Sequence, residues 1–256
     1  MSAIEVHQFT CRSDNYCVLI HDADSGFTAS IDAPEEKAIR QALSDTGWGL
    51  THIFNTHHHF DHVEGNANLK AEFGCTIIGP KDEADKIPQI DEAYGHGEHF
   101  AFGKHRVEVI GTPGHTLGEV SYHIPDQGMA FTGDTLFALG CGRIFEGTAE
   151  MMWQSLQRLA GLPRDTIVYC GHEYTLSNAK FAVTIDPDNQ ALTTRLDEII
   201  QLRAENKPTL PTSIGLELDT NPFLRPGDKN IRENLGMMKA SDTEVFAEIR
   251  TRKDNF

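Results

Sequence analysis

Thr56-His57-His58-His59-Phe60-Asp61-His62 is the stretch of sequence that decides the fold and the chemistry of this chain. It comes directly after Thr51-His52-Ile53-Phe54-Asn55, a short run rich in residues that favour β-strands. We therefore predict that the histidine-rich stretch forms a loop at the end of a strand, where functional sites are commonly found. Imidazole and carboxylate groups suit Zn, Fe or Mn better than Ca or Mg, so this stretch predicts a transition-metal site.

The spacing within the stretch allows two metal positions. In extended backbone, side chains two residues apart point to the same side, so His57 and His59 can converge on one ion. Asp61 and His62 can then turn toward a second ion. A solvated histidine-rich loop is the alternative. The acid within the stretch and the helix-like segment behind it, residues 64–72, both disfavour that alternative.

Three later segments share one design, an apolar strand that ends in a polar residue beside glycine. They present His115 after Gly114, Asp134 after Gly133 and His172 after Gly171. Glycine permits tight turns, and a strand holds the side chain in a fixed place. Each residue alone could equally be a hydrogen-bonded loop residue. Together with the first cluster they make seven candidate ligands, too many for one tetrahedral zinc and suited to two ions that share a carboxylate.

Composition excludes several other classes of function. The 256 residues fit one large domain or one domain with a small appendage. A formal net charge of −16 opposes binding to nucleic acid or to an anionic membrane. No apolar run approaches the ~18 residues of a membrane span, and the N-terminus lacks a secretory signal pattern. Five scattered cysteines without a C-x-x-C pair predict reduced thiols, so we predict a cytoplasmic protein.

Hydrophobic patterning predicts a β-rich part, residues 1–173, followed by an all-helical part, residues 174–256. In the first part, residues 81–97 with His96, and also His99 and His105, are predicted to lie at the surface.

A helix is expected to begin at Pro34, with Ile39, Ala42 and Leu43 on its inner face, and to end near Gly47. Another is expected after Thr148, with Met152, Leu156 and Leu159 inward and Trp153 in the core or a domain interface. Leu192, Leu196, Ile199 and Ile200 indicate a helix in the second part, as do Val245, Phe246 and Ile249 after the capping box Ser241-x-x-Glu244. The predicted strands are residues 4–9, 16–20, 28–31, 75–78, 107–110, 120–124, 129–132 and, as the last, 166–170.

The H-x-H-x-D-H run with its distant His, Asp and His resembles the signature of the metallo-β-lactamase superfamily. That resemblance implies an α+β fold, a four-layer αββα sandwich, here with a C-terminal all-helical domain. More narrowly, the chain resembles the glyoxalase II family, the hydroxyacylglutathione hydrolases, along nearly its full length. The segments that carry the narrower resemblance are Gly140-Cys141-Gly142-Arg143, Gly171-His172-Glu173-Tyr174-Thr175, Thr220-Asn221-Pro222-Phe223 and Arg250-Thr251-Arg252-Lys253-Asp254.

The resemblance implies two divalent metal ions, with zinc favoured over iron or manganese. By that resemblance, His57, His59 and His115 bind the first ion, Asp61, His62 and His172 bind the second, and Asp134 bridges them. The implied reaction is hydrolysis of S-D-lactoylglutathione and related hydroxyacylglutathione thioesters by a metal-bridging hydroxide. It yields glutathione and a hydroxy acid, the second step of methylglyoxal detoxification. Asp61, a ligand beside the attacking water, is the candidate to steer its proton.

The resemblance also implies that Arg143, Tyr174, Arg250 and Lys253 bind the glutathione part of the substrate. Arg250 and Lys253 are three residues apart and therefore share a face of the final helix. A solvated cluster of charge at a helix C-terminus stays open as the alternative for these two residues. Phe145 departs from relatives that carry tyrosine there, and it cannot donate a hydrogen bond to glutathione.

Other functions stay open. A glutathione persulfide dioxygenase with a single iron would share the sandwich, and another hydrolase of the superfamily, a β-lactamase or a lactonase, is a further alternative. A non-enzymatic binding module is disfavoured because the ligand set is complete. The only expected partner is a small-molecule glutathione thioester, without nucleic acid or membrane, and a monomer is favoured.

Overall fold

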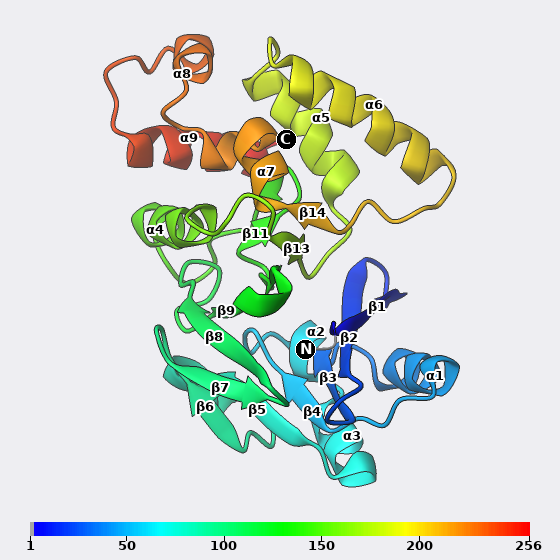
Figure 1. The fold of residues 1–256 in the computed structure, drawn as a ribbon. Helices are drawn as coiled ribbons and strands as arrows, with labels where there is room; N and C mark the ends of the chain where they lie inside the picture. The colour runs from blue at the N-terminus through cyan, green and yellow to red at the C-terminus, as the bar shows by residue number, and fades with distance from the viewer. Residues whose placement is uncertain (1–2) are drawn as a thin grey trace. The chain divides into compact units, whose positions relative to one another are not determined.

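The computed structural model describes residues 3–256, and their contacts divide the chain into two compact units (Figure 1). Unit 1 takes the residues up to Gly111 and Thr116–Gly133, and unit 2 takes Thr112–His115 and Asp134–Phe256. This division follows contacts, so the predicted domain boundary after residue 173 stays a prediction. Within residues 3–256, no helix combines the length and the hydropathy that crossing a bilayer requires.

The first sheet of unit 1 changes from antiparallel to parallel pairing along its strand order β1-β2-β3-β4-β5-β6. The antiparallel part contains the predicted strands at residues 4–9, 16–20 and 28–31, observed as β1 (Glu5–Cys11), β2 (Asn15–Asp22) and β3 (Phe27–Ile31). The parallel part consists of β4 (His52–Phe54), β5 (Thr76–Pro80) and β6 (Glu92–Tyr94). Parallel neighbours need crossover connections. These contain α1 (Glu36–Thr46) between β3 and β4, α2 (Phe60–Val63) and α3 (Asn66–Phe73) between β4 and β5, and the 3-10 helix η1 (Lys81–Lys86) between β5 and β6.

Helix α1 confirms the prediction from its apolar spacing. Ile39, Ala42 and Leu43 are buried, in one cluster with Leu19, Ile53 and Ile77 of the first sheet. The helix ends at Gly47, whose φ of 73° is a left-handed conformation that glycine adopts without a steric penalty. The N–H of Gly47 donates to the Leu43 carbonyl oxygen and so closes the last turn.

The second sheet of unit 1 is antiparallel and packs its aromatic face on the first. Its strands are β7 (His99–Phe102), β8 (His105–Gly111), β9 (Val120–Ile124) and β10 (Met129–Phe131), with the short 3-10 helix η2 (Pro125–Gln127) before β10. Phe54 of the first sheet lies with its ring centroid 4.9 Å from that of Phe100 and 5.6 Å from that of Tyr122. Such tilted and edge-to-face ring pairs are favourable beyond the area that they bury.

Unit 2 is built mainly from helices around an aromatic core. Its elements are β11 (Leu136–Phe137), β12 (Gly140–Cys141), α4 (Ala149–Ala160), β13 (Ile167–Tyr169), α5 (Thr175–Ile185), α6 (Gln190–Ala204), β14 (Thr212–Ser213), α7 (Ile214–Thr220), η3 (Pro222–Leu224), α8 (Lys229–Leu235) and α9 (Asp242–Asp254). Trp153 of α4 is buried and stacks on Phe246 of α9 with ring centroids 5.9 Å apart. The predicted caps of both helices are present. At the start of α4, the Thr148 side chain accepts a hydrogen bond from Met151 N, and at the start of α9, Ser241 and Glu244 form a capping box.

Several local predictions are wrong for identifiable reasons. Residues 81–97 are not simply a surface loop, because they contain the 3-10 helix η1 (Lys81–Lys86), strand β6 and the buried Glu83. The predicted last strand is followed by β14, which pairs antiparallel with β13 and interrupts the helical part. These short segments are ordered by pairing and contact with distant residues, which hydrophobic periodicity does not reveal.

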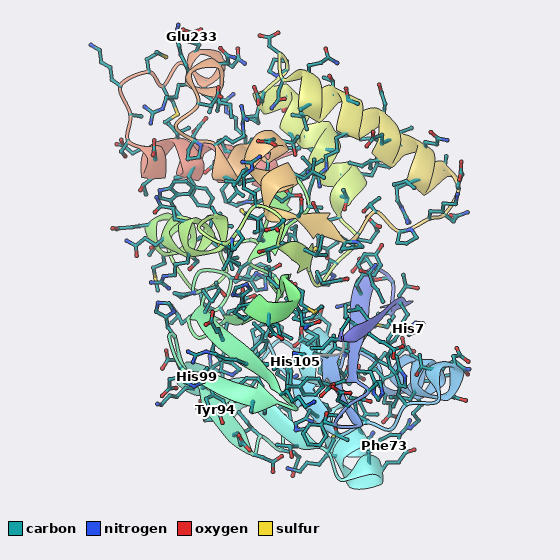
Figure 2. All side chains as sticks on the ribbon, in the orientation of Figure 1. His7, Phe73, Tyr94, His99, His105 and Glu233 are labelled. Atoms are coloured by element: carbon teal, nitrogen blue, oxygen red, sulfur yellow. The ribbon has the colours of Figure 1, made fainter. Side chains whose placement is uncertain are left out.

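His105 is the clearest of these corrections, because it is buried and paired with carboxylates (Figure 2). Its Nδ1 lies 2.6 Å from Asp126 Oδ2, and its Nε2 lies 3.9 Å from Asp22 Oδ1. Asp22 also accepts a 2.6 Å hydrogen bond from Ser25 Oγ. The polar sequence around His105 predicts a surface position, whereas His105 belongs to a buried polar network.

This network predicts a loss of stability in acid. Burial alone raises the pKa of both Asp22 and Asp126, but hydrogen bonds from Ser25 and the Asp24 N–H to Asp22, and from His105 to Asp126, lower each pKa overall. A carboxyl group whose pKa is lower in the folded protein than in the unfolded chain, where it is about 3.9, stabilises the fold at pH values above about 3.9. This stabilisation is lost as the pH falls through the pKa of the folded protein. We expect Asp126→Asn to lower Tm at pH 6, with the gap to the wild type closing toward pH 3 in calorimetry. A gap of constant size from pH 6 to pH 3 would contradict the assignment.

Candidate metal centre

His57 and His59 lie in the loop that follows β4, as the sequence indicated. His57 Nε2 lies 3.1 Å from His59 Nδ1, so the two rings present nitrogen atoms to one point. The other ring nitrogen of His57, Nδ1, lies 3.0 Å from Thr56 Oγ1 and 4.0 Å from a carboxylate oxygen of the buried Glu119. Contacts of this kind fix the orientation of a metal-binding imidazole.

Asp61 and His62 lie in a helical turn, whereas the sequence predicted a loop for the whole histidine-rich stretch. Both residues belong to α2, and the His62 N–H donates to the His59 carbonyl oxygen at 2.8 Å. The turn brings Asp61 Oδ2 to 3.7 Å from His62 Nε2. Asn15 Nδ2 donates to both the carbonyl oxygen and Oδ2 of Asp61, each at 3.2 Å, and so restrains this carboxylate.

Asp32 organises the ligand loop and was missed by sequence reasoning. It is buried and accepts hydrogen bonds from Thr56 N at 2.7 Å and Thr56 Oγ1 at 2.9 Å. Its Oδ2 also lies 2.8 Å from His62 Nδ1. A carboxylate only accepts, so Nδ1 carries the proton and Nε2 of the neutral ring has the lone pair for a metal. The signal in the sequence was present, because Ser30-Ile31-Asp32 also ends a strand in a polar residue.

His115, Asp134 and His172 come together within unit 2. Asp134 Oδ2 lies 3.5 Å from His115 Nε2 and 3.3 Å from His172 Nε2. His115 Nδ1 donates to the Arg143 carbonyl oxygen at 2.8 Å, which leaves its Nε2 as the acceptor. Gly142 is required beside this group, because a Cβ there would collide with the Asp134 carbonyl oxygen.

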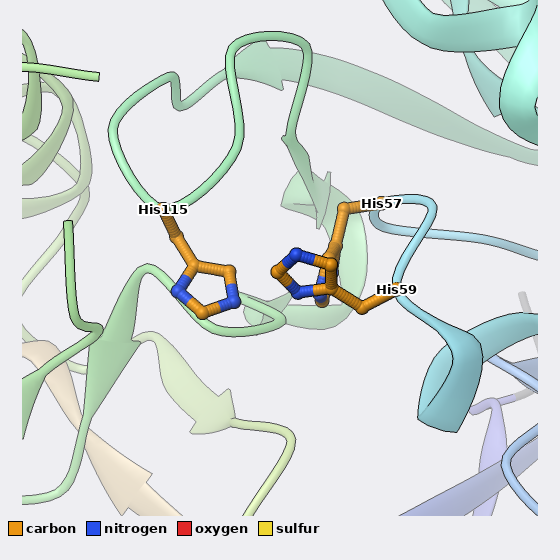
Figure 3. Close-up of side chains that lie close together, drawn as sticks. All are labelled: His57, His59 and His115. Atoms are coloured by element: carbon orange, nitrogen blue, oxygen red, sulfur yellow. The ribbon is translucent and has the colours of Figure 1, made fainter. Parts of the chain in front are cut away.

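These side chains form three groups, and within each group one ligand atom from every residue lies within 4.8 Å of the others. The first group is His57, His59 and His115, which Figure 3 shows. The second is His57, His62 and Asp134, and the third is Asp61, His62 and His172. Two ligands of one tetrahedral zinc lie about 3.3 Å apart, given Zn–N bonds of about 2.0–2.1 Å. The four distances between candidate ligand atoms given above, 3.1, 3.3, 3.5 and 3.7 Å, lie on both sides of that value. Neutral imidazoles and carboxylates at these spacings fit divalent metal ions.

Arg250 and Lys253 both lie on α9, and their surroundings differ. Arg250 is buried, donates to the Cys141 carbonyl oxygen at 2.8 Å and lies over the Phe223 ring at 5.1 Å from its centroid. It therefore supports the β12 segment, a role that the sequence did not reveal. Lys253 Nζ donates to the carbonyl and hydroxyl oxygens of Ser177, each at 3.1 Å.

Lys253 belongs to a concentration of positive charge within unit 2. The pKa of Lys253 is lowered to about 8, chiefly by burial and also by the cationic Arg250 and Arg143, while Asp254 opposes the shift. Asp254 Oδ1 lies 3.0 Å from Arg250 Nη2 and 3.9 Å from Arg143 Nε. Lys253 is therefore a cation whose charge is only marginally maintained near neutral pH, and an anionic ligand beside it would restore the charged form.

Tyr174 and Phe145 contact ligand histidines of unit 2. The Tyr174 ring stacks on His172 with an interplanar angle of 1° and centroids 4.8 Å apart. The Phe145 ring lies 5.1 Å from that of His115 and is exposed. Neither contact tests the predicted role in substrate binding, so the roles of Arg143, Tyr174, Arg250 and Lys253 stay predictions.

Two family models match adjoining parts of the chain. The metallo-beta-lactamase superfamily matches residues 12–172, and the hydroxyacylglutathione hydrolase C-terminus matches residues 173–256. The hydroxyacylglutathione hydrolase of Rhizobium meliloti (strain 1021) is 62% identical over 256 residues, which is 100% of both chains. The chain belongs to the hydroxyacylglutathione hydrolase family of the metallo-beta-lactamase superfamily.

Further relatives agree with this family. The hydroxyacylglutathione hydrolase of Brucella anthropi is 63% identical over 253 residues, covering 99% of this chain and 97% of the relative. Among solved structures, that of ETHE1 from Myxococcus xanthus matches with a TM-score of 0.70 and 27% identity, covering 96% of this chain and 90% of that one. The predicted fold class, an α+β metallo-β-lactamase fold with a helical C-terminal region, is confirmed.

Cys141 shows that a cysteine in a family segment need not be reactive. The cysteines of the described residues are all free and buried, which agrees with the predicted reduced thiols. Burial raises the pKa of Cys141 to about 11, although Arg250 opposes the shift. The thiol therefore stays protonated near neutral pH, and only the thiolate is a good nucleophile or metal ligand.

Proposed function

We propose that this chain hydrolyses the thioester bond of hydroxyacylglutathiones, S-D-lactoylglutathione among them, to glutathione and a hydroxy acid. This reaction would be the second step of methylglyoxal detoxification. The observation that carries the proposal is the 62% identity to a curated hydroxyacylglutathione hydrolase over the whole length of both chains. The match of residues 173–256 to the hydroxyacylglutathione hydrolase C-terminus supports the substrate class.

The proposed centre holds two divalent metal ions, with zinc favoured over iron or manganese. His57, His59 and His115 would bind one ion, and Asp61, His62 and His172 the other. Asp134 would bridge them, which is supported by its Oδ2 lying within 3.5 Å of two imidazole nitrogens. When bound, two such ions supply Lewis acidity and lower the pKa of a coordinated water toward neutrality.

The residues of the chain would do the remaining work. Asp32 and the Arg143 carbonyl hold the imidazoles of His62 and His115 with the Nε2 lone pair available. Asp61, restrained by Asn15, would accept the proton of the attacking water and pass it on. The leaving group is a thiolate whose free thiol has a pKa of about 8.5, so its expulsion needs no strong acid.

The glutathione part of the substrate would bind to Arg143, Tyr174, Arg250 and Lys253. Its carboxylates are anionic, and the three cations of this set lie close enough together for Arg143 and Arg250 to lower the pKa of Lys253. Phe145 would lack the hydrogen bond that a tyrosine could give at its position. We expect the selectivity for the peptide part to differ accordingly from that of relatives with tyrosine.

The predicted organisation of the molecule extends this proposal. We place the boundary between a catalytic domain, residues 1–173, and a glutathione-binding domain, residues 174–256, because one family model ends at residue 172 and the other begins at 173. We further propose a cytoplasmic monomer without nucleic-acid or membrane partners. The net charge of −16 supports the last point, because it repels polyanionic surfaces.

The test pairs two assays on one metal-replete preparation. We expect S-D-lactoylglutathione to be hydrolysed, with release of free thiol, and no oxygen to be consumed with glutathione persulfide. Oxygen uptake without thioester hydrolysis would replace the proposal by the single-iron dioxygenase alternative. Hydrolysis of a β-lactam or a lactone in preference to glutathione thioesters would move the chain to another branch of the superfamily.

A further inference from the structure

We propose that Glu83 is a positioning residue for the metal ligands, which it holds by clamping two backbone segments. One segment carries His57 and His59, and the other follows His115. The inference rests on the metal arrangement proposed above, and no part of the sequence pattern pointed to Glu83. It lies in η1, in a stretch of polar sequence that resembles a surface loop.

The geometry of the clamp is bidentate. Glu83 is 1% exposed, and its Oε1 accepts a hydrogen bond from His58 N at 2.8 Å. Its Oε2 accepts a second from Gly118 N at 3.1 Å and lies 3.2 Å from His58 Nδ1. The two bonds join residues that are 25 and 35 positions away from Glu83 in the chain. One carboxylate thus ties the two loops, which a hydrogen bond from Val120 N to the Thr56 carbonyl oxygen also joins at 2.9 Å.

Burial makes this carboxylate a strong restraint. A charged carboxylate removed from water is unfavourable unless hydrogen-bond donors compensate it, and bonds from N–H groups to an ionised oxygen are the stronger kind. The fold can therefore keep Glu83 buried only while both N–H groups remain in place. Displacement of either loop would leave a buried charge incompletely paired.

The restrained atoms are next to the ligands. His58 N belongs to the peptide that joins His57 to His58, and His59 follows directly, so fixing this peptide limits the direction of both ligand side chains. Gly118 is three residues after His115. A Cβ on Gly118 would lie 2.9 Å from both Cγ and Oε2 of Glu83, so only glycine allows the carboxylate to approach this closely.

The experiment compares zinc affinity, stability and kinetics in Glu83→Gln. A glutamine would face one of the two N–H groups with an NH2 group, so one arm of the clamp is lost while side-chain size is kept. We expect the dissociation constant of at least one zinc ion, measured by chelator competition, to rise about 10- to 100-fold, as for other residues that orient ligands. At saturating zinc, kcat should fall while KM stays within about twofold, because Glu83 is not among the residues proposed to bind glutathione.

Two controls separate this role from general destabilisation. Asp22→Asn removes another buried carboxylate of unit 1, outside the ligand loops, and should lower Tm without changing zinc affinity. His58→Ala keeps both backbone bonds to Glu83 and should bind zinc nearly as the wild type does. Should Glu83→Gln fail to fold, Glu83→Asp, which keeps the charge but is too short to reach both loops, provides the same comparison.

A Glu83 variant with lowered Tm but unchanged zinc affinity and kcat would overturn the inference and leave Glu83 a purely structural residue. This outcome is distinct from failure of the proposed function. A wild-type protein that binds two zinc ions but hydrolyses no glutathione thioester would refute the function, while the zinc affinities would still decide the role of Glu83.

Discussion

Asp134→Ala is expected to lower kcat/KM for S-D-lactoylglutathione by at least about 10³-fold, or about 4 kcal/mol of transition-state stabilisation. It should also lower the bound zinc from two ions per chain to one or fewer. The reason is the position of Asp134 Oδ2, 3.5 Å from His115 Nε2 and 3.3 Å from His172 Nε2. An anion at this place offsets the repulsion between two cations, and alanine supplies no such charge. The measurement is steady-state kinetics with elemental analysis of the same preparation.

The control for Asp134→Ala is Asp186→Asn. Asp186 is also buried in unit 2, with its Oδ2 3.3 Å from Arg225 Nη2, so its loss tests the general effect of removing a buried carboxylate. We expect Asp186→Asn to lower stability and to keep two zinc ions. The dinuclear proposal fails if Asp134→Ala keeps both ions and a kcat within about tenfold of the wild type.

Lys253→Met is expected to raise KM about 10- to 100-fold with kcat within about threefold of the wild type. A hydrogen bond to a charged group contributes about 1.5–3 kcal/mol, which corresponds to this range. Methionine keeps an unbranched apolar side chain at this position but has no charge to place over the Phe181 and Phe256 rings, which Lys253 Nζ approaches to 5.3 and 5.2 Å from their centroids. The loss should therefore fall on ground-state binding, which appears in KM.

The lowered pKa of Lys253 adds a pH dependence to this prediction. Lysine is charged below its pKa and neutral above it, so binding of an anionic substrate should weaken as pH rises through about 8. The wild-type KM should rise between pH 7 and pH 9, and that of Lys253→Met should stay flat over the same range. Lys229→Met, on the exposed face of α8, is the matched control. A Lys253→Met profile that rises in parallel with the wild type would exclude Lys253 as the titrating group.

The strands that precede the candidate ligand segments could be predicted from the sequence because each is a local pattern. Strand propensity followed by His or Asp, with glycine nearby, is visible within a few residues, and β4, β8, β10 and β13 do precede those segments. The amphipathic helix α1 and the caps of α4 and α9 were predictable for the same reason. In each case the deciding interactions lie within one or two helical turns.

The supporting contacts were not predictable, because they join residues far apart in the chain. Asn15 reaches Asp61 across 46 positions, Asp32 reaches His62 across 30, and Glu83 reaches Gly118 across 35. Of these residues, only Asp32 stands in a recognisable sequence pattern, directly after a strand. His105 was placed at the surface for the same reason, since its carboxylate partner Asp126 is 21 residues away.

Arg250 shows a further limit of sequence reasoning. The helical spacing placed Arg250 and Lys253 on one face, yet Arg250 is buried and bound to the Cys141 carbonyl oxygen. Its truncation would leave that buried carbonyl without this donor and would remove contact with the Phe223 ring. Replacement of Arg250 therefore combines loss of stability with any loss of substrate binding, and Lys253 is the clearer probe of the glutathione site.

X-ray absorption spectroscopy of the zinc-loaded protein tests the central claim most directly. Two ions bridged by Asp134 should give nitrogen and oxygen scatterers at about 2.0–2.1 Å and a zinc–zinc vector at about 3.5–4 Å. The zinc–zinc vector should disappear in Asp134→Ala. A single four-coordinate zinc without a metal–metal vector, or a vector that persists unchanged in Asp134→Ala, would contradict the account.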